Sequence, residues 1–516
     1  LKGKPISTLE TRLAGIDQSI MAELTPQYAA QSTDLVLPFE RISGAGVHIT
    51  GAKAANLARI GNELNLPVPA GFSVTTVATE RFLFTNGLND FIAKRLAQVS
   101  PDQPEAFAHH SEEIRAAIVN IPVPPDIAEE IVQAYRELEK KTRPGVRVAV
   151  RSSAVGEDTE ATFAGQYETV LNVAESGILE AYKRVLASKY SPRSVAYRLR
   201  YGLSDRETPM AVAVVAMIDP ISSGVMYTNA PSGTTSGDIS ISSIRGLAER
   251  LVDGSASPDL FIVDRESRSI KDRRIARQET RMVNLPTGGT VLQSVPVHER
   301  ESSSINDAAL QTLADYGLKL EAHFGRPQDV EWALDESGGL FIIQSRPIGG
   351  SGTTIRSDVP AVDEVVHPVA LASGKPASAG IAAGPVFVLQ EGMDTAQAPD
   401  GAVLVARTAS PDLAKLSTRV AAIITDIGSA ASHLASVCRE FGVPLIVDTG
   451  NATRTLRSGD IVTLTTDPPR VYTGIVEELT GLIQPRRKQV FDSPVHRRMR
   501  RVLDLVSPLG LTDPDA

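Results

Sequence analysis

A coil-forming stretch near residue 350 divides this chain into two segments that must fold around separate cores. Residues 347–354 read Pro-Ile-Gly-Gly-Ser-Gly-Thr-Thr, a composition that behaves as a flexible linker. The chain has 516 residues, and at roughly 150 residues per domain this length predicts about three domains. We therefore place the main domain boundary at this stretch.

Hydrophobic patterning predicts mixed α/β structure on both sides of the linker. Short β-branched runs alternate with helical stretches before it, and after it three apolar runs about twenty residues apart enclose a predicted helix at 432–441. The expected parts are a helical N-terminal arm over 1–40, a mixed α/β domain over 41–348, a flexible linker over 349–365, a compact α/β domain over 366–476, and a basic helical tail or linker over 477–516.

Composition excludes several classes of protein. Lys and Arg total 52 against 61 acidic residues, a net charge of -9, so no global basic field favours nucleic acid. The single cysteine, Cys438, excludes an internal disulfide framework and a Cys-rich zinc site, and is typical of a cytoplasmic protein. No apolar run approaches the roughly 18 residues that span a bilayer. We expect a cytoplasmic protein without membrane or nucleic-acid partners.

Two basic residues lie where a chain can approach phosphate. The strand predicted at 146–150 runs into Arg151, followed by Ser152 and Ser153, and a planar guanidinium at a strand end suits polyphosphate oxygens. Lys53 begins a predicted helix after a flexible turn, where its ammonium and backbone amides could meet a phosphate together. The alternatives are a surface ion pair of Arg151 with a nearby acidic residue, and an ordinary surface lysine.

A predicted β-hairpin carries the candidate metal ligands. Asp-Val-Glu-Trp at 329–332, a turn at 338–339 and Gln-Ser-Arg at 344–346 place Glu331 and Gln344 on neighbouring strands. A carboxylate and an amide oxygen on one face could both bind Mg²⁺. Arg346 could then neutralise charge on a transferred phosphoryl group. The alternative is a surface hairpin with an exposed ion pair.

The candidate nucleophile is His433. Residues 425–433 read Thr-Asp-Ile-Gly-Ser-Ala-Ala-Ser-His and lead from an apolar strand through small residues into a helix. At a helix N-terminus the dipole disfavours imidazolium, and a neutral imidazole is a competent nucleophile. The alternative is a capping or packing histidine.

In their order along the chain, these segments resemble the phosphoenolpyruvate (PEP) synthase and pyruvate phosphate dikinase family, also called the PEP-utilising enzymes. The resemblance covers about residues 49–474. The residues on the family's ATP-site positions are Lys53, Arg151, Glu331, Gln344 and Arg346. Asp259 and Asp264 match a further signature, with Glu249 just upstream, and residues 425–433 correspond to the mobile phosphohistidine domain.

This resemblance implies an α/β (α+β) fold, with an ATP-grasp-like nucleotide-binding domain followed by a swivelling phosphohistidine domain. It implies ATP and Mg²⁺ as cofactors, bound by Lys53, Arg151, Glu249, Arg346 and the metal ligands Glu331 and Gln344. In the family a histidine, here His433, takes a pyrophosphoryl group from ATP and AMP is released. The histidine loses the outer phosphoryl and gives the other to an acceptor such as pyruvate. Catalytic roles fall to His433, Arg346 and Arg151.

The sequence departs from the family pattern at three places. Ser429 and Ala431 replace a glycine and a threonine of the histidine loop, Val215-Ala216 replaces a polar pair, and Arg245-Gly246-Leu247-Ala248-Glu249 replaces a Trp-Gly-Leu-Gly-Glu element. We also expect a chain that either stops before the family's barrel domain or works with a separate acceptor domain or subunit. Two other hypotheses are the same half-reaction serving a phenol or alcohol, and a non-catalytic nucleotide-responsive scaffold.

Overall fold

The structure is a computed structural model. It describes residues 32–43, 46–98, 104–155, 167–200, 203–230, 237–348, 362, 364–390 and 392–483. The predicted arm up to residue 31, linker residues 349–361 and 363, and the predicted tail from 484 lie outside the described residues. In the part of the chain that is described, no helix is long and apolar enough to cross a membrane.

The first sheet is antiparallel, and helices cover both of its faces. Its strands, in spatial order, are β1 (Val36–Pro38), β2 (Gly71–Val74), β5 (Met210–Ala216), β3 (Val148–Ala154) and β4 (Thr169–Val173). The helices of this region are α2 (Val47–Leu64), α3 (Thr76–Thr85), α4 (Leu88–Leu96), α5 (Pro104–Asn120), α6 (Pro125–Lys141), α7 (Ile178–Ser188) and α8 (Pro192–Arg200).

Strand β5 shows why this sheet is buried on both sides. All seven of its residues are buried, and alternate side chains enter different cores because successive residues of a strand point to opposite faces. Val212 and Val214 pack with the α3 and α7 side, whereas Ala213 and Val215 pack against α2. The same alternation makes Val36–Pro38 a strand, although the sequence analysis placed these residues in a helical arm.

The second sheet is also antiparallel, in the order β13 (Leu340–Pro347), β12 (Gln328–Asp335), β6 (Pro220–Tyr227), β7 (Ile239–Arg245), β8 (Asp259–Val263) and β9 (Ile270–Arg274). Helix α10 (Asp307–Phe324) packs on one face of it. The short helix α9 (Glu249–Val252) follows β7. The hairpin of β10 (Thr280–Asn284) and β11 (Thr290–Ser294) reaches the first sheet, where Asn172 Nδ2 donates to the Leu285 carbonyl at 2.6 Å.

The third sheet forms the domain after the linker. Its eight strands lie in the order β14 (Val369–Leu371), β21 (Pro469–Thr473), β20 (Ile461–Thr466), β16 (Ile381–Leu389), β17 (Val403–Thr408), β18 (Ala422–Ile427), β19 (Leu445–Val447) and β15 (Lys375–Ser378). Strands β16, β17, β18 and β19 lie side by side in the order of the sequence, and each pairs in parallel with the next. The helices are α11 (His433–Phe441), α12 (Ala452–Thr455) and α13 (Glu477–Thr480). Single 3₁₀ turns are η1 (Phe39–Arg41), η3 (Glu175–Gly177), η4 (Asp205–Glu207), η5 (Val297–Glu299), η6 (Thr395–Gln397) and η7 (Pro411–Leu416).

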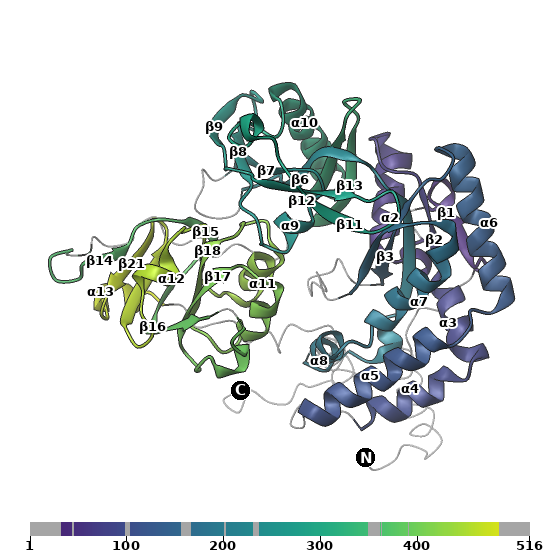
Figure 1. Ribbon diagram of the computed structural model, residues 1–516, viewed down its shortest axis with the longest axis horizontal. Coiled ribbons are helices and arrows are strands. Elements are labelled where there is room, and N and C mark those ends of the chain that lie inside the picture. The colour runs from purple at the N-terminus through teal and green to yellow at the C-terminus, as the bar shows by residue number, and fades with distance from the viewer. Residues whose placement is uncertain are drawn as a thin grey trace, which may run out of the picture.

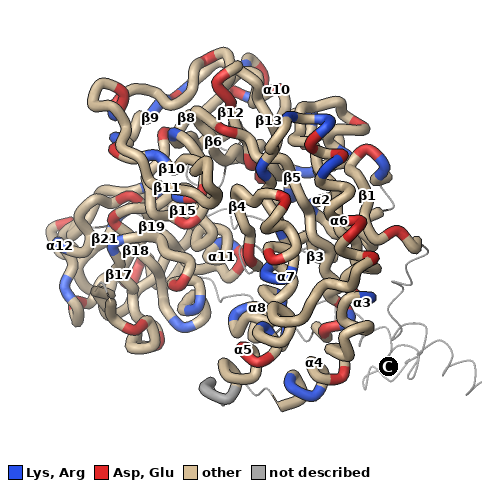
Figure 2. Tube along the Cα trace, turned by 45° about the vertical axis from the view of Figure 1, so that its right-hand side comes forward, with Lys and Arg blue, Asp and Glu red and all other residues tan. Residues whose placement is uncertain are grey.

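The third sheet presents α11 to the rest of the chain, next to α8 and α9 (Figure 1). Ala431, just before α11, packs with Val225, Tyr227 and other apolar residues of the second sheet. Gly254, at a φ of +75°, comes so close to the next domain that an added Cβ would lie 2.5 Å from the carbonyl oxygen of Ala409. We call this contact between the second and third sheets the docking seam. Basic and acidic residues are interspersed along all of these regions (Figure 2).

Candidate active site

Arg151 joins the first sheet to the hairpin of the second. It lies on β3, and its Nη2 donates to Gln344 Oε1 at 2.7 Å and lies 3.3 Å from Glu331 Oε2. Glu331 and Gln344 are direct partners across β12 and β13, so the predicted hairpin and the shared face of these two residues are confirmed. The carboxylate neutralises the half-buried guanidinium. We call Lys53, Arg151, Glu331, Gln344 and Arg346 the cradle.

Lys53 is held beside Arg151 by a close approach of two backbones. Helix α2 is kinked at Gly51, which has a φ of +72°, and an added Cβ there would lie 1.7 Å from the Ser153 carbonyl oxygen. Only glycine combines this φ with this approach. Ser153 Oγ donates to the Thr50 carbonyl at 2.8 Å, and Lys53 Nζ donates to Ser152 Oγ at 3.1 Å. The end of β3 therefore fixes the lysine near the guanidinium.

Arg346 links the cradle to the third sheet. On β13, its Nε and Nη2 donate to Asp329 Oδ2 at 2.9 and 2.7 Å. The same Nη2 lies 3.3 Å from Ser436 Oγ, which is one turn along α11 from His433. One side chain thus touches both the predicted nucleotide site and the helix of the predicted nucleophile.

The residues predicted to hold magnesium fit that ion. Glu331 Oε2 and Gln344 Oε1 converge on one nitrogen of Arg151, and carboxylate and amide oxygens are ligands that Mg²⁺ accepts. Within the described ranges, no cluster of three or more His, Cys, Asp or Glu gathers to bind a metal. A site with few protein ligands suits magnesium, which usually keeps waters and binds substrate phosphates.

His433 is the first residue of α11, as predicted. Ser432 caps the helix by accepting a hydrogen bond from the Ala435 amide at 3.3 Å. The imidazole is only 6% exposed, and burial, followed by the charges of Arg193 and Arg346, lowers its pKa to about 3. The ring is therefore neutral at pH 7, with one nitrogen free of a proton.

The loop before His433 is built from small buried residues. Ser429 stands where the family has a glycine. Its Oγ accepts a hydrogen bond from the Ala431 amide at 3.0 Å, and this bond stabilises the turn that follows Ser429. The Ala431 methyl group lies in the apolar cluster shared with the second sheet. Asp426 at the end of β18 accepts from the Thr453 amide at 3.1 Å and fixes the other end of the loop. These contacts hold the backbone that presents the histidine.

Arg193 was not predicted from the sequence, yet it contacts the ring. Its Nη2 contacts His433 Nε2 from α8. On the same pair of helices, Tyr197 Oη donates to Glu440 Oε1 at 3.3 Å. The segment Pro-Arg-Ser-Val at 192–195 reads as an ordinary amphipathic helix, so the sequence held no signal for this contact.

Three other residues named in the sequence analysis lie outside the cradle. Glu249 is exposed on α9 and accepts from Thr290 Oγ1 at 3.3 Å, and no described contact joins it to the cradle. Asp259 is fully buried and accepts from Ser304 Oγ at 2.6 Å. Hydrogen bonds from Lys271 and then from Ser267 hold the pKa of Asp264 far below its usual range. Both aspartates therefore hold loops.

The departures from the family pattern also have structural roles. Val215 is buried against α2, and Ala216 belongs to the core of the first sheet. Arg245 pairs with Glu299 at 3.3 Å and donates to Ser302 Oγ at 2.9 Å. These residues pack or tie loops. The acidic residues at 157 and 158, the alternative partners of Arg151, lie outside the described residues.

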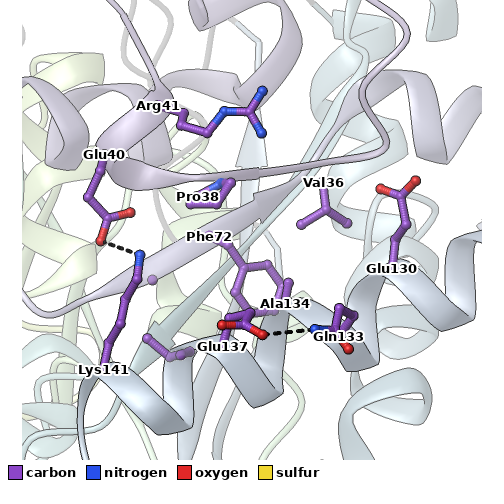
Figure 3. A pocket seen from close by; sticks show the side chains of 12 residues that line it. Val36, Pro38, Glu40, Arg41, Phe72, Glu130, Gln133, Ala134, Glu137 and Lys141 are labelled. Atoms are coloured by element: carbon purple, nitrogen blue, oxygen red, sulfur yellow. Dashed lines mark hydrogen bonds and ion pairs between the residues drawn. The ribbon is translucent and has the colours of Figure 1, made fainter.

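A separate cavity of about 220 Å³ lies between α6 and the β1–β2 edge (Figure 3). Its rim carries the pair of Lys141 and Glu40, 3.0 Å apart, and the hydrogen bond of Gln133 to Glu137 at 2.9 Å. No cradle residue lines it. Lys141 and Glu40 neutralise each other at this rim, and His433 does not line the cavity.

Residues 47–364 match the family of the pyruvate phosphate dikinase AMP/ATP-binding domain, and residues 398–467 match the mobile domain of PEP-utilising enzymes. Together with the three sheets and the helices that pack on them, these matches confirm the expected fold class.

Several curated relatives are named phosphoenolpyruvate synthase or probable phosphoenolpyruvate synthase. Phosphoenolpyruvate synthase of Pyrococcus furiosus is 34% identical over 485 residues, covering 86% of this chain and 59% of that protein. A probable phosphoenolpyruvate synthase of Archaeoglobus fulgidus is 36% identical over 438 residues, covering 84% of this chain and 57% of that protein. The chain thus spans less than two thirds of the length of these relatives.

A solved structure that matches is an L-amino acid ligase from Bacillus licheniformis. It is 14% identical, covers 53% of this chain and 58% of that chain, and has a TM-score of 0.18. A similarity of this size carries no information about the function of this chain.

Proposed function

The chain belongs to the pyruvate phosphate dikinase family of PEP-utilising enzymes, and from this premise we propose that it is an ATP-dependent phosphotransferase that phosphorylates its own His433. The observation that carries the proposal is Arg346, which bonds Asp329 in the hairpin and Ser436 in α11. Through this side chain the predicted nucleophile and the predicted nucleotide site are neighbours.

In this proposal the cradle binds the polyphosphate of ATP. Lys53, Arg151 and Arg346 supply three positive charges, and Glu331 and Gln344 would hold magnesium. When bound, the magnesium ion neutralises part of the phosphate charge. Phosphoryl transfer depends mostly on charge neutralisation and alignment, so residues fixed by Gly51 and by the hairpin register suit this task.

The neutral imidazole of His433 then acts as the nucleophile. A nitrogen lone pair forms a bond to the β-phosphorus, the bond from that phosphorus to the α-phosphate oxygen breaks, and AMP leaves with the electron pair. The other ring nitrogen keeps its proton, and the negative phosphoryl groups offset the positive ring. The outer phosphoryl group then passes to the oxygen of water or of inorganic phosphate as its bond to the inner phosphoryl group breaks, which leaves one phosphoryl group on the histidine for the acceptor.

Transfer to the acceptor requires the domain over 366–476 to leave the cradle, and the linker predicted over 349–365 would permit this. We propose pyruvate as the acceptor because the relatives are named phosphoenolpyruvate synthases. A phenol or an alcohol is the second candidate acceptor, whereas the altered loop at Ser429 and Ala431 motivates the alternative of a non-catalytic, nucleotide-responsive scaffold.

The test uses the whole chain with Mg²⁺ and ATP labelled separately at the β and γ positions. We expect AMP release and an acid-labile label that comes from the β position and maps to His433 by mass spectrometry. Adding pyruvate should remove the label and form PEP, whereas removal only by a phenol or alcohol identifies the second acceptor class. A chain that binds ATP but takes no label is a nucleotide-responsive scaffold, and the proposal is then wrong.

A further inference from the structure

Two arginines that come from different parts of the molecule lie near the imidazole of His433. Arg193 reaches Nε2 from α8, and Arg346 reaches the next turn of α11 from β13. Both charges lower the pKa of the histidine. Because a cation disfavours a second cation beside it, this pocket selects the neutral ring.

The two arginines differ in how their charge is balanced. Arg346 donates two hydrogen bonds to one carboxylate oxygen of Asp329. For Arg193, no carboxylate within ion-pair distance occurs among the residues that the structure describes, and the neutral imidazole is its partner. Burial lowers the pKa of this guanidinium, and Asp412 only partly opposes the effect. A half-buried guanidinium without a carboxylate is poised to bind an anion.

An anion must arise at this place if His433 is phosphorylated. The contact with Nε2 means that the lone pair of this nitrogen points to the guanidinium. A phosphoryl group bonded to Nε2 would therefore take the place now occupied by Arg193 Nη2, with its oxygens next to the guanidinium. The planar guanidinium can donate to two phosphate oxygens at once, whereas the ring nitrogen offers it only one acceptor.

We propose that Arg193 is a further catalytic residue, which binds the phosphoryl groups as they pass from ATP to Nε2 of His433. The inference rests on the proposed function and adds α8 to its machinery. When the bond from Nε2 to the β-phosphorus forms and the bond to the α-phosphate breaks, the guanidinium leaves the nitrogen and pairs with the phosphoryl oxygens. No proton moves in this step, because Nε2 carries none and Nδ1 keeps its own.

A purely structural role for Arg193 makes different predictions. If it only held α11 against α8, loss of the Tyr197–Glu440 hydrogen bond in the same interface should have a similar effect. The variants are Arg193→Gln, which removes the charge, and Arg193→Lys, which keeps the charge but not the fork. Tyr197→Phe is the matched control, because it weakens the interface and leaves Arg193 in place.

The experiment measures single-turnover labelling of the whole chain by β-labelled ATP with Mg²⁺. We expect Arg193→Gln to slow labelling about 100-fold or more, Arg193→Lys about 10-fold, and Tyr197→Phe by less than about 3-fold. The dissociation constant of ATP should change less than about 2-fold. The acid limb of the labelling rate should move to higher pH in Arg193→Gln, because the neutral ring is then less favoured.

The outcomes separate the two proposals. No label in the unchanged chain overturns the proposed function and this inference together. A labelled unchanged chain with equal rates in Arg193→Gln, or with equal losses in Arg193→Gln and Tyr197→Phe, overturns this inference alone. Unchanged fluorescence of Trp332 shows that the variants fold. If Arg193→Gln does not fold, the labelling rate of Arg193→Lys tests the inference in its place.

Discussion

Positive charge is balanced differently in the cradle and in the pocket of His433. In the cradle, Arg151 is neutralised by Glu331, and Arg346 by Asp329. In the histidine pocket, Arg193 contacts the neutral ring itself, and the charges of Arg193 and Arg346 both lower the pKa of His433. The cradle therefore lies within the part of the chain before the linker, whereas the pocket combines residues from both sides of the linker and, among the described residues, gives Arg193 no carboxylate partner.

The largest expected effect separates chemistry from binding. Replacing His433 by Gln should reduce labelling by β-labelled ATP at least about 10⁴-fold, because the amide of glutamine cannot act as the nucleophile. ATP affinity, measured by equilibrium dialysis, should change less than about 2-fold. A labelled His433→Gln chain would place the nucleophile elsewhere and remove the distinction between the two regions.

The next effect concerns Arg346, which belongs to both regions. Arg346→Gln should slow labelling about 100-fold to 1000-fold, because one positive charge near the transferred group is lost. Arg136→Gln is the control, since its pairing with Glu175 at 2.8 Å is exposed and such pairs contribute little. Single-turnover rates check this, and a loss below about 5-fold would mean that Arg346 only ties α11 to the hairpin.

A third prediction tests whether the cradle depends on its backbone. Gly51→Ala should destabilise the first sheet by about 3 to 5 kcal/mol, because the methyl group meets the Ser153 carbonyl and the φ is positive. Gly87→Ala has a similar φ of +66° with open space around it, and should cost about 1 to 2 kcal/mol. Urea midpoints measure both by circular dichroism, and equal midpoints would contradict the close approach.

The smallest effect is the pH dependence of docking. The docked pKa of His433 is about 3 against an ordinary 6.5, so docking is strongest above pH 6.5 and weakens as the pH falls towards 3. At pH 5 the loss is about 30-fold, or about 2 kcal/mol. Arg193 and Arg346 stay charged there, and Asp412 stays ionised because Lys415 holds its pKa low.

Small-angle scattering at pH 8 and pH 5 checks this prediction. The unchanged chain should expand at pH 5 as the third sheet leaves the rest of the molecule. His433→Gln cannot titrate in this range and should keep its dimensions. The same expansion in both chains would assign the pH dependence to other groups.

The sequence predicted the cradle better than the pocket, for a physical reason. The pairing of Glu331 with Gln344 follows from a short turn and strand alternation, and the place of Arg151 follows from a strand end. Such signals are local in the chain. The resemblance then connected Lys53 with them, although Gly51 and Ser153 are about a hundred residues apart.

The pocket depends on contacts that local patterns do not encode. Arg193 and His433 are 240 positions apart, and they meet because α8 and α11 pack at an interface between domains. The sequence did predict the helix start at His433, since Ser432 is a favoured cap. It could not predict the burial of the ring, and the place of Glu249 away from the cradle was also not foreseen.

The close contact at the docking seam offers a way to keep the third sheet apart from the second. Gly254 lies against Ala409 with no room for one more carbon atom, and neither residue belongs to the cradle or touches His433. Adding a methyl group at position 254 would act as a wedge that holds the carrier at a distance while every group that handles phosphate stays intact. In the proposed cycle, such a variant would bind ATP but could not bring His433 to the cradle, so nucleotide binding could be studied apart from phosphoryl transfer.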